Sequence, residues 1–409
     1  MKTILIVAYH YPPENGSCSE KNVRIVKKFV EAGYRVRVIT RNATEKDSLN
    51  ERLSIYHTKS GRFHKDIPKI EDCTCSRAQE GHGIKSQMKA FLSAAAIPDA
   101  TIDWIPEVKR YISNHSDVLK GVDLIYSISS PYSVHLLSRD ISRITHIPYI
   151  MCYGDPWIYE PKRRRGIIRY RIEKMMEKAL IDEAAGVSLI TEWNRREYMR
   201  LYDIPEKKIN TYLIGYEENN NYANSEERIC PEFSLLYGGS LDLVHRNVEP
   251  FMKAMKKISG VYIEIRNNDF PQLKDLIMKY NLKGRVVAKP LIPSDEFVKL
   301  QYKFDALILF GNKTPFQIPG KVFTYISTGK TIIYIKNNTF SDDGTEDVLR
   351  KYGNAIIVNN EENAIAESIN QFIHGSRMIE SCNSMQFKYD ITMEPLVEMV
   401  DRVINQNNR

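Results

Sequence analysis

The stretch Gln317-Ile-Pro-Gly-Lys-Val-Phe-Thr-Tyr-Ile-Ser-Thr-Gly-Lys330 is the most informative one in the chain, because it joins two apolar segments through a turn, one lysine and a short helical pattern. The apolar run 306–311 before it predicts a buried parallel strand, and 331–335 predicts the next one. Pro319 suits the first turn of a helix between them. A helix that starts at the carboxyl end of a parallel strand offers unpaired N–H groups to phosphate, and Lys321 adds a cation there.

Strands and helices alternate along the rest of the chain, which predicts parallel sheets with right-handed crossovers. We expect strands at 3–9, 35–40, 123–128, 148–153, 187–191, 210–214, 233–238, 262–266, 285–289, 306–310, 331–335 and 355–358. Residues 44–83 are polar and turn-rich, which indicates a large excursion, and the polar run 216–224 indicates a domain break. The pattern therefore predicts an α/β protein of two Rossmann-like domains, 1–215 and 216–389, with a last helical segment in 390–409. A cleft between two such sheets is the natural ligand site.

Composition favours a two-domain enzyme. The chain has 409 residues, 43% of them hydrophobic, which suffices for two cores. Its six cysteines show no disulfide framework, as in a reducing compartment. No apolar run approaches the roughly 18 residues that span a bilayer, and the apolar start is too short for a signal peptide. We expect a cytoplasmic protein, or one attached peripherally at the inner face of the plasma membrane.

The 317–330 stretch resembles the nucleotide-sugar-binding segment of the family 4 glycosyltransferases, which are retaining enzymes of the GT-B fold. The family wording is close to (I/P)P-x-K-x-(F/L)-E-Y-(L/M)-A-x-G-K-P, and the matching residues are Ile318, Pro319, Lys321, Phe323, Tyr325, Gly329 and Lys330. Thr324 stands where the family usually has a glutamate that binds the donor ribose. In the GT-B fold the last helix crosses back to the first domain, which the resemblance implies here for 390–409.

Other segments resemble the same family in the same order. The opening turn 10–16 is similar to YPPxxGG, with Gly16 as the first glycine and Ser17 in place of the second; the alternative is a plain turn. Residues 98–104 resemble PD…W, and 123–135 resemble D(V/L)IxxSSPPxSxH. Residues 147–157 resemble IPxxxDxRDPW, with Cys152 and Gly154 replacing the first aspartate and the arginine.

The resemblance implies a role for each candidate site residue. Arg246 and Lys321 would clamp the donor pyrophosphate, since guanidinium and ammonium groups both pair with phosphate oxygens. Asp155 and His135 would orient or deprotonate the acceptor hydroxyl, although a lone histidine at the end of an element is often structural. The expected donor-binding residues are Gly16, Gly238, Gly239, Ser240, Gln317, Ile318, Pro319, Phe323 and Thr324.

No D-x-D carboxylate pair follows a suitable strand, so we expect no metal and no cofactor beyond the nucleotide sugar. The acidic run 342–347 is interpreted instead as the start of a helix at Ser341, where acids cap the end and favour the dipole. The leaving nucleoside diphosphate would then be stabilised by Arg246, Lys321 and the helix N-terminus.

Between Lys162 and Lys174, seven basic residues stand against one acid, with apolar residues between them. This segment predicts contact with an anionic membrane surface or an anionic acceptor; the alternative is a solvated helix face. No nucleic-acid-binding motif is visible.

The resemblance as a whole implies a retaining, metal-independent glycosyltransferase. It would move a sugar from a nucleotide-sugar donor, a UDP-sugar, to a glycan or lipid-linked saccharide acceptor in bacterial surface polysaccharide biosynthesis. The alternatives are a GT-B epimerase, a GT-B phosphorylase, or a GT-B protein that binds a ligand or partner without turnover.

Overall fold

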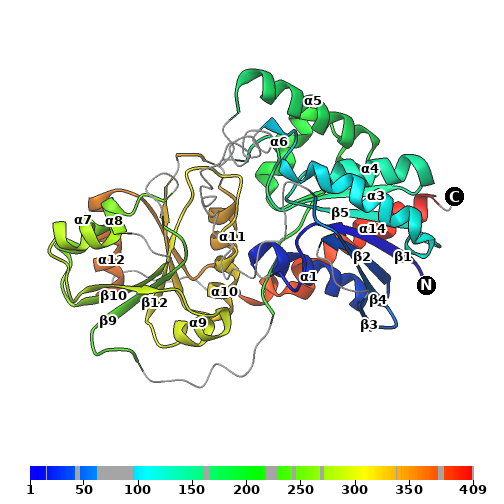
Figure 1. Ribbon diagram of the computed structural model, residues 1–409. Helices are drawn as coiled ribbons and strands as arrows, with labels where there is room; N and C mark the ends of the chain where they lie inside the picture. The colour runs from blue at the N-terminus through cyan, green and yellow to red at the C-terminus, as the bar shows by residue number, and fades with distance from the viewer. Residues whose placement is uncertain are drawn as a thin grey trace, which may run out of the picture. The chain divides into compact units, whose positions relative to one another are not determined.

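The computed structural model describes residues 1–14, 16–41, 47–61, 95–160, 165–217, 228–241, 246–267, 271–337, 339–341, 343–375 and 382–407. The chain forms two compact units (Figure 1). Unit 1 comprises Met1–Ile214 and Met393–Arg409, and unit 2 comprises Gly215–Thr392.

Unit 1 is built on a sheet in the order β3-β4-β2-β1-β5-β6-β7-β8. Every neighbouring pair is parallel except β3 and β4. From β4 onwards this is a Rossmann-type order, in which the chain moves outward from β1 in one direction and then resumes on its other side. The strands are β1 (Thr3–Ala8), β2 (Arg35–Arg41), β3 (Asp47–Asn50), β4 (Leu53–Thr58), β5 (Leu124–Ser129), β6 (Tyr149–Tyr153), β7 (Gly186–Leu189) and β8 (Ile209–Thr211).

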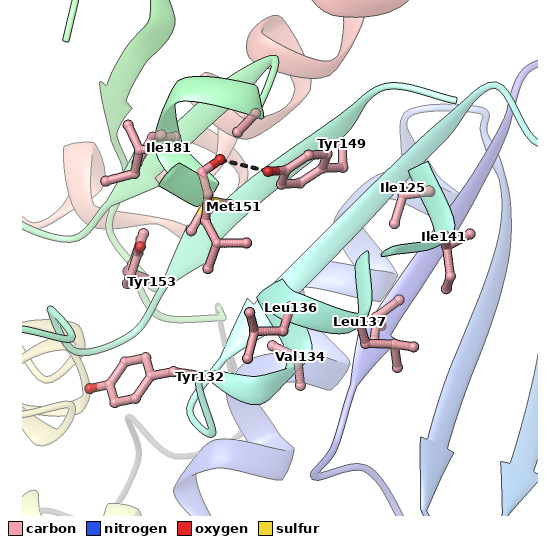
Figure 2. Close-up of a cluster of buried hydrophobic side chains, with 14 of the residues drawn as sticks. Ile125, Tyr132, Val134, Leu136, Leu137, Ile141, Tyr149, Met151, Tyr153 and Ile181 are labelled. Atoms are coloured by element: carbon pink, nitrogen blue, oxygen red, sulfur yellow. Dashed lines mark hydrogen bonds between the residues drawn. The ribbon is translucent and has the colours of Figure 1, made fainter. Parts of the chain in front are cut away.

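Helices cover this sheet because its strands are apolar on both faces; β1 and β5 are buried throughout. Figure 2 shows part of one core layer, where Leu136, Leu137 and Ile141 of α4 approach Ile125 of β5. Tyr149 in this layer donates a hydrogen bond to the Leu180 carbonyl oxygen at 2.6 Å. The helices are α1 (Ser17–Glu31), α3 (Trp104–Asn114), α4 (Ser133–Thr145), α5 (Ile167–Glu183) and α6 (Glu192–Tyr202), with short 3₁₀ turns at Ala100–Asp103, Ser116–Val118 and Glu206–Lys208.

The last helix, α14 (Glu394–Asn407), belongs to unit 1, as the predicted crossing requires. Its Met399 lies so close to Gly186 of β7 that a side chain at that glycine would overlap the sulfur region. Asn210 of β8 donates to the Pro395 carbonyl oxygen at 2.5 Å, and Lys28 of α1 pairs with Glu394 at 2.8 Å. Packing and polar contacts together therefore hold α14 on unit 1.

Unit 2 has a six-stranded sheet in the order β11-β10-β9-β12-β13-β14, and all its pairs are parallel. The strands are β9 (Phe233–Gly238), β10 (Val261–Asn267), β11 (Val286–Pro290), β12 (Ala306–Phe310), β13 (Thr331–Lys336) and β14 (Ala355–Asn359). The helices are α7 (Glu249–Lys257), α8 (Pro271–Lys279), α9 (Ser294–Gln301), α10 (Lys321–Ser327), α11 (Gly344–Tyr352), α12 (Glu362–Ile373) and α13 (Tyr389–Thr392), with a 3₁₀ turn at Met385–Phe387.

The structure confirms the predicted fold class, two Rossmann-like α/β domains of the GT-B type, and all twelve predicted strands. The interpretation of 44–83 as a polar excursion is wrong in part, because it contains β3 and β4. β4 pairs in parallel with β2 and is mostly buried. Among the described helices, none has the length and apolar character needed to cross a bilayer.

Candidate active site

The candidate site in unit 2 lies where the sheet changes direction. β9 and β12 are neighbours although they are not consecutive, and the chain runs outward on opposite sides of this pair. At such a switch point the loops after the two strands separate and leave room for a ligand at their carboxyl ends. Gly238 ends β9 and is followed by Gly239 and Ser240, and Gly311 and Asn312 follow β12. The structure therefore gathers several predicted donor residues at this edge.

Lys321 is the first residue of α10, the helix that follows β12, and its side chain extends to the end of β9. Its ammonium group donates to the carbonyl oxygen of Gly238 and lies 5.2 Å from the centre of the Tyr237 ring. A Cβ atom at Gly239 would overlap the Lys321 ammonium, and Gly239 has φ 141°, which side chains rarely adopt. Position 239 must therefore be glycine for Lys321 to take this place.

Arg246 lies on the same edge and joins the ends of β9 and β12. Its Nε donates to Asn312 Oδ1 at 2.9 Å, and its Nη1 donates to the Ser240 carbonyl oxygen at 2.9 Å. The Tyr237 hydroxyl donates to the same carbonyl oxygen at 2.9 Å. The guanidinium group is thus oriented by neutral acceptors.

Two cations meet here, and no carboxylate of the described residues pairs with either of them. Burial, and then the charge of Arg246, lower the pKa of Lys321 to about 7. Neither side chain forms an ion pair with an acid in the described part of the chain. Partly buried charges are normally paired, so this arrangement suits an anionic ligand.

The remaining predicted donor residues lie in the loop before α10 and on that helix. Gln317 and Ile318 are half-buried in the loop and Pro319 is buried. The helix begins at Lys321, and Pro319 belongs to the preceding turn, where its carbonyl oxygen accepts from Val322 N at 2.9 Å. Phe323 is buried on α10. The Thr324 hydroxyl donates to the Lys321 carbonyl oxygen at 2.8 Å, so it is engaged inside its own helix.

The predicted acceptor residues Asp155 and His135, and the predicted donor residue Gly16, belong to unit 1, near the switch point between β1 and β5. Gly16 is the N-cap residue of α1, with φ 130°. Asp155 follows β6 and is half-buried, and its carboxylate accepts no hydrogen bond from the residues that the structure describes.

His135 is fully buried in the first turn of α4. Its Nδ1 lies 2.7 Å from Ser127 Oγ, which donates in turn to the Ile150 carbonyl oxygen, so the imidazole Nδ1 carries the proton. Burial, and then the charge of Lys21, lower the pKa of His135 to about 3. These contacts favour the structural alternative for His135.

The PD…W segment and Cys152 in unit 1 also make contacts that stabilise the fold. Asp99 accepts from Thr101 N at 3.2 Å and from Tyr132 N at 2.7 Å, so it ties the 3₁₀ turn to the start of α4. Cys152, at the position of the first aspartate, donates its thiol proton to the Tyr212 hydroxyl at 3.3 Å. The PD…W segment therefore has a structural explanation.

The acidic run begins outside the described residues, at Asp342. Asp343 is the N-cap of α11: its Oδ1 accepts from Thr345 N at 2.9 Å, and its Oδ2 accepts from the Tyr334 hydroxyl at 2.6 Å. The capping interpretation is confirmed, but the cap is Asp343 and not Ser341. Within the described ranges, no three His, Cys, Asp or Glu side chains gather as a metal site.

Sequence reasoning missed Tyr237, Asn312 and Lys21. Tyr237 and Asn312 could have been found from the predicted strands. Tyr237 lies at the end of the strand 233–238, and Asn312 follows the strand 306–310. Lys21 is buried in α1 and donates to the Ser129 carbonyl oxygen at 2.7 Å. No local signal distinguishes it from the other lysines of its helix.

The chain matches no protein-family model and no curated protein sequence. Its fold is similar to several solved structures. Sucrose-phosphate synthase from Thermosynechococcus elongatus is 14% identical, with a TM-score of 0.63 over 100% of this chain and 98% of that one. Anabaena HepE in complex with UDP and glucose is 12% identical, with a TM-score of 0.65 over 98% and 100%. A UDP-N-acetylglucosamine 2-epimerase is 10% identical, with a TM-score of 0.54 over 100% and 97%. At these identities the likeness establishes the GT-B fold and no more.

Proposed function

We propose that this protein is a retaining, metal-independent glycosyltransferase that uses a UDP-sugar donor. The observation that carries the proposal is the Arg246 and Lys321 pair, two cations without a described carboxylate partner at the switch point of the unit 2 sheet. The UDP and UDP-glucose complexes of the similar HepE structures support a uridine donor.

The pair would act on the leaving group. When the bond between the sugar and the diphosphate breaks, negative charge grows on the diphosphate oxygens. Arg246 and Lys321, already oriented by backbone carbonyl oxygens, would stabilise that charge without reorganisation. They would take the place of a metal ion, and no cofactor beyond the nucleotide sugar is proposed.

For the acceptor, Asp155 is the better candidate than His135, because its carboxylate is half-exposed at the end of β6. It would orient the acceptor hydroxyl or take its proton. The resemblance supports retention and a glycan or lipid-linked saccharide acceptor of bacterial surface polysaccharides.

A GT-B epimerase is the second candidate, since 2-epimerases appear among the similar structures. Such an enzyme also holds a nucleotide sugar by its diphosphate, so the cation pair alone does not separate the two activities. The products do: a transferase releases UDP slowly into water without acceptor, whereas an epimerase returns a UDP-sugar of changed configuration.

The test is a screen of UDP-sugars for thermal stabilisation, followed by product analysis in excess chelator. We expect one or a few UDP-sugars to raise the melting temperature and to release UDP. Lys321→Met should lower the release rate by roughly two to three orders of magnitude. Lys313→Met, which removes an exposed lysine from the same loop, should not.

Three results would contradict the proposal. Unchanged turnover in a folded Lys321→Met variant would show that Arg246 and Lys321 do not act together on the leaving diphosphate. Loss of activity in chelator, restored by Mg²⁺ or Mn²⁺, would exclude the metal-free mechanism. An epimerised UDP-sugar as the product would establish the second candidate.

A further inference from the structure

Helix α5 in unit 1, drawn green in Figure 1, carries apolar side chains on its exposed face. Ile168 is 77% exposed, Ile172 41% and Met175 73%, at the i, i+4 and i+7 spacing of one helical stripe. Ile167 beside them is 74% exposed. We call these four residues the α5 stripe. A surface helix of a globular protein normally turns such a stripe inward.

The opposite face of α5 carries buried carboxyl groups. Glu173 is fully buried and accepts from Arg165 Nε at 2.7 Å, Arg169 Nε at 2.7 Å and Trp157 Nε1 at 3.0 Å. Glu177, one turn later, is also fully buried and accepts from Tyr198 and Tyr202 at 2.7 and 2.6 Å. The usual polarity of a surface helix is thus reversed, and the buried contacts fix which face points outward.

These contacts also correct the interpretation of the basic segment. Arg165 and Arg169 are not free surface charges, because both pair with Glu173. Arg169 also donates to the Ala96 carbonyl oxygen at 2.6 Å, which ties α5 to the segment before α3. Lys162, Arg163 and Arg164 lie outside the described residues.

Cations remain beside the stripe. Arg171 is exposed and Lys174 is half-buried, and neither pairs with a described carboxylate. Lys178 is exposed and pairs with Asp182 at 2.9 Å. An apolar groove of about 710 Å³ runs along the start of α5, lined by Ala95, Ile97, Ile168 and Ile172 among others. Apolar side chains thus lie next to cations that have no carboxylate partner among the described residues.

We propose that the α5 stripe is a membrane-docking face that inserts into the surface of a bilayer containing anionic lipid. Isoleucine and methionine side chains would enter the boundary between headgroups and acyl chains, as the apolar face of an interfacial helix does. Arg171 and Lys174 would contact the headgroups. Charge complementarity favours lipid over a second copy of the chain, which would bring Arg171 and Lys174 close to the same two cations of the other copy.

Insertion of the α5 stripe adds an apolar contribution to electrostatic attraction, and the salt dependence of vesicle binding distinguishes the two. A solely basic surface would release from vesicles in salt. The α5 stripe adds a contribution that salt does not screen, so binding should weaken with salt but persist. Membrane docking by the α5 stripe does not depend on the catalytic activity proposed above.

The test is cosedimentation of the protein with vesicles of phosphatidylcholine and phosphatidylglycerol. The double variant Ile168→Glu, Met175→Glu should lose binding by at least about tenfold, since each change removes buried methylene groups and adds a repelled charge. Ile144→Glu is the control, because Ile144 is 75% exposed on α4 in the same unit. It should bind as the wild type does, and unchanged thermal unfolding should show that all variants fold.

Absence of vesicle binding by the wild-type protein would overturn the proposal, and so would equal loss in the Ile144→Glu control. Binding that salt abolishes and the double variant retains would reduce the surface to its cations. A dimer in solution that Ile168→Glu dissociates, without vesicle binding, would assign the stripe to a second copy of the chain.

Discussion

The ammonium group of Lys21 lies where a side chain at Gly154 would have to lie. Lys21 comes from α1, and Gly154 follows β6, so the two meet only through the fold. Gly154 stands where the family pattern has an arginine. A cation is therefore present at this end of the unit 1 sheet, but α1 supplies it. Lys21 therefore supplies a positive charge at the end of β6, where the family motif would have its arginine.

This relationship predicts that the two positions are coupled. Gly154→Ala should displace the Lys21 ammonium from the Ser129 carbonyl oxygen and destabilise unit 1 by about 1–2 kcal/mol, the usual loss when a buried polar group loses its partner. In a Lys21→Ala background the same change should be nearly neutral. A double-mutant cycle would give a coupling energy of about 1 kcal/mol.

Unfolding can be followed in unit 1 alone, because all three tryptophans, Trp104, Trp157 and Trp193, belong to it. Additive effects of Gly154→Ala and Lys21→Ala on the fluorescence transition would contradict the coupling.

The pKa of Lys321 predicts how UDP binding depends on pH. Burial and Arg246 hold this pKa at about 7 in the free protein, and a bound diphosphate should raise it, because the anion favours the charged ammonium. Above pH 7 the lysine must take up a proton on binding. Affinity should then fall by up to about tenfold per pH unit.

The phosphate groups of UDP ionise near pH 6, so they do not confound the range above pH 7. Titration calorimetry in buffers of different ionisation enthalpy would detect the proton uptake. In Lys321→Met, affinity should be weaker and independent of pH between 7 and 9. A pH-independent affinity in the wild-type protein would show that Lys321 does not contact the diphosphate.

Much of the fold could be predicted because most strands are continuous apolar runs with both faces buried. β4 was missed because it is an isolated segment with polar neighbours, and its pairing with β2 is a tertiary contact. Arg246 and Lys321 could be placed together because both follow strands that a Rossmann-type order makes adjacent.

Charge pairing could not be predicted in the same way. A run of basic residues resembles a solvated face, and only the fold reveals that Arg165 and Arg169 both turn inward to Glu173. The burial of Lys21 and His135 likewise depends on how α1 and α4 pack on the sheet. Sequence gives residue types at strand ends, whereas the direction of long side chains is set by packing.

Thr324 offers a test of how α10 is placed. Its hydroxyl donates its proton to the Lys321 carbonyl oxygen, so it can offer a ribose hydroxyl only the lone pairs of one neutral oxygen and not the charge of a carboxylate. Thr324→Glu should restore an acidic acceptor and tighten UDP binding several-fold, since two hydroxyl groups can donate to one carboxylate. Ser327→Glu, one turn later on α10, is the control and should leave affinity unchanged. Equal effects of both variants would show that charge on the helix, and not the position, matters.

The buried carboxyl group of Glu177 predicts how the stability of unit 1 depends on pH. Burial raises its pKa to about 7, although Tyr202 and Tyr198 donate to it and oppose the shift. The native state therefore keeps this proton over a range where the unfolded chain has lost it. The contribution to stability is present below the unfolded pKa of about 4.5 and is lost as the pH rises through about 7. At roughly 1.4 kcal/mol per pKa unit, the loss is at most about 3.5 kcal/mol.

Glutamine resembles the neutral carboxyl group, so Glu177→Gln should unfold at nearly the same denaturant concentration as the wild type at pH 5 and at a higher one at pH 8. Glu197→Gln on α6 is the control of opposite sign, because the Arg200 hydrogen bond holds the pKa of Glu197 below its usual value. That variant should lose stability at pH 8, where the wild-type carboxylate is charged and paired. Tryptophan fluorescence reports both transitions within unit 1. The same difference in stability between Glu177→Gln and the wild type at pH 5 and at pH 8 would contradict this prediction. It would mean that Glu177 does not titrate in this range and that the tyrosine hydrogen bonds keep its carboxylate charged throughout.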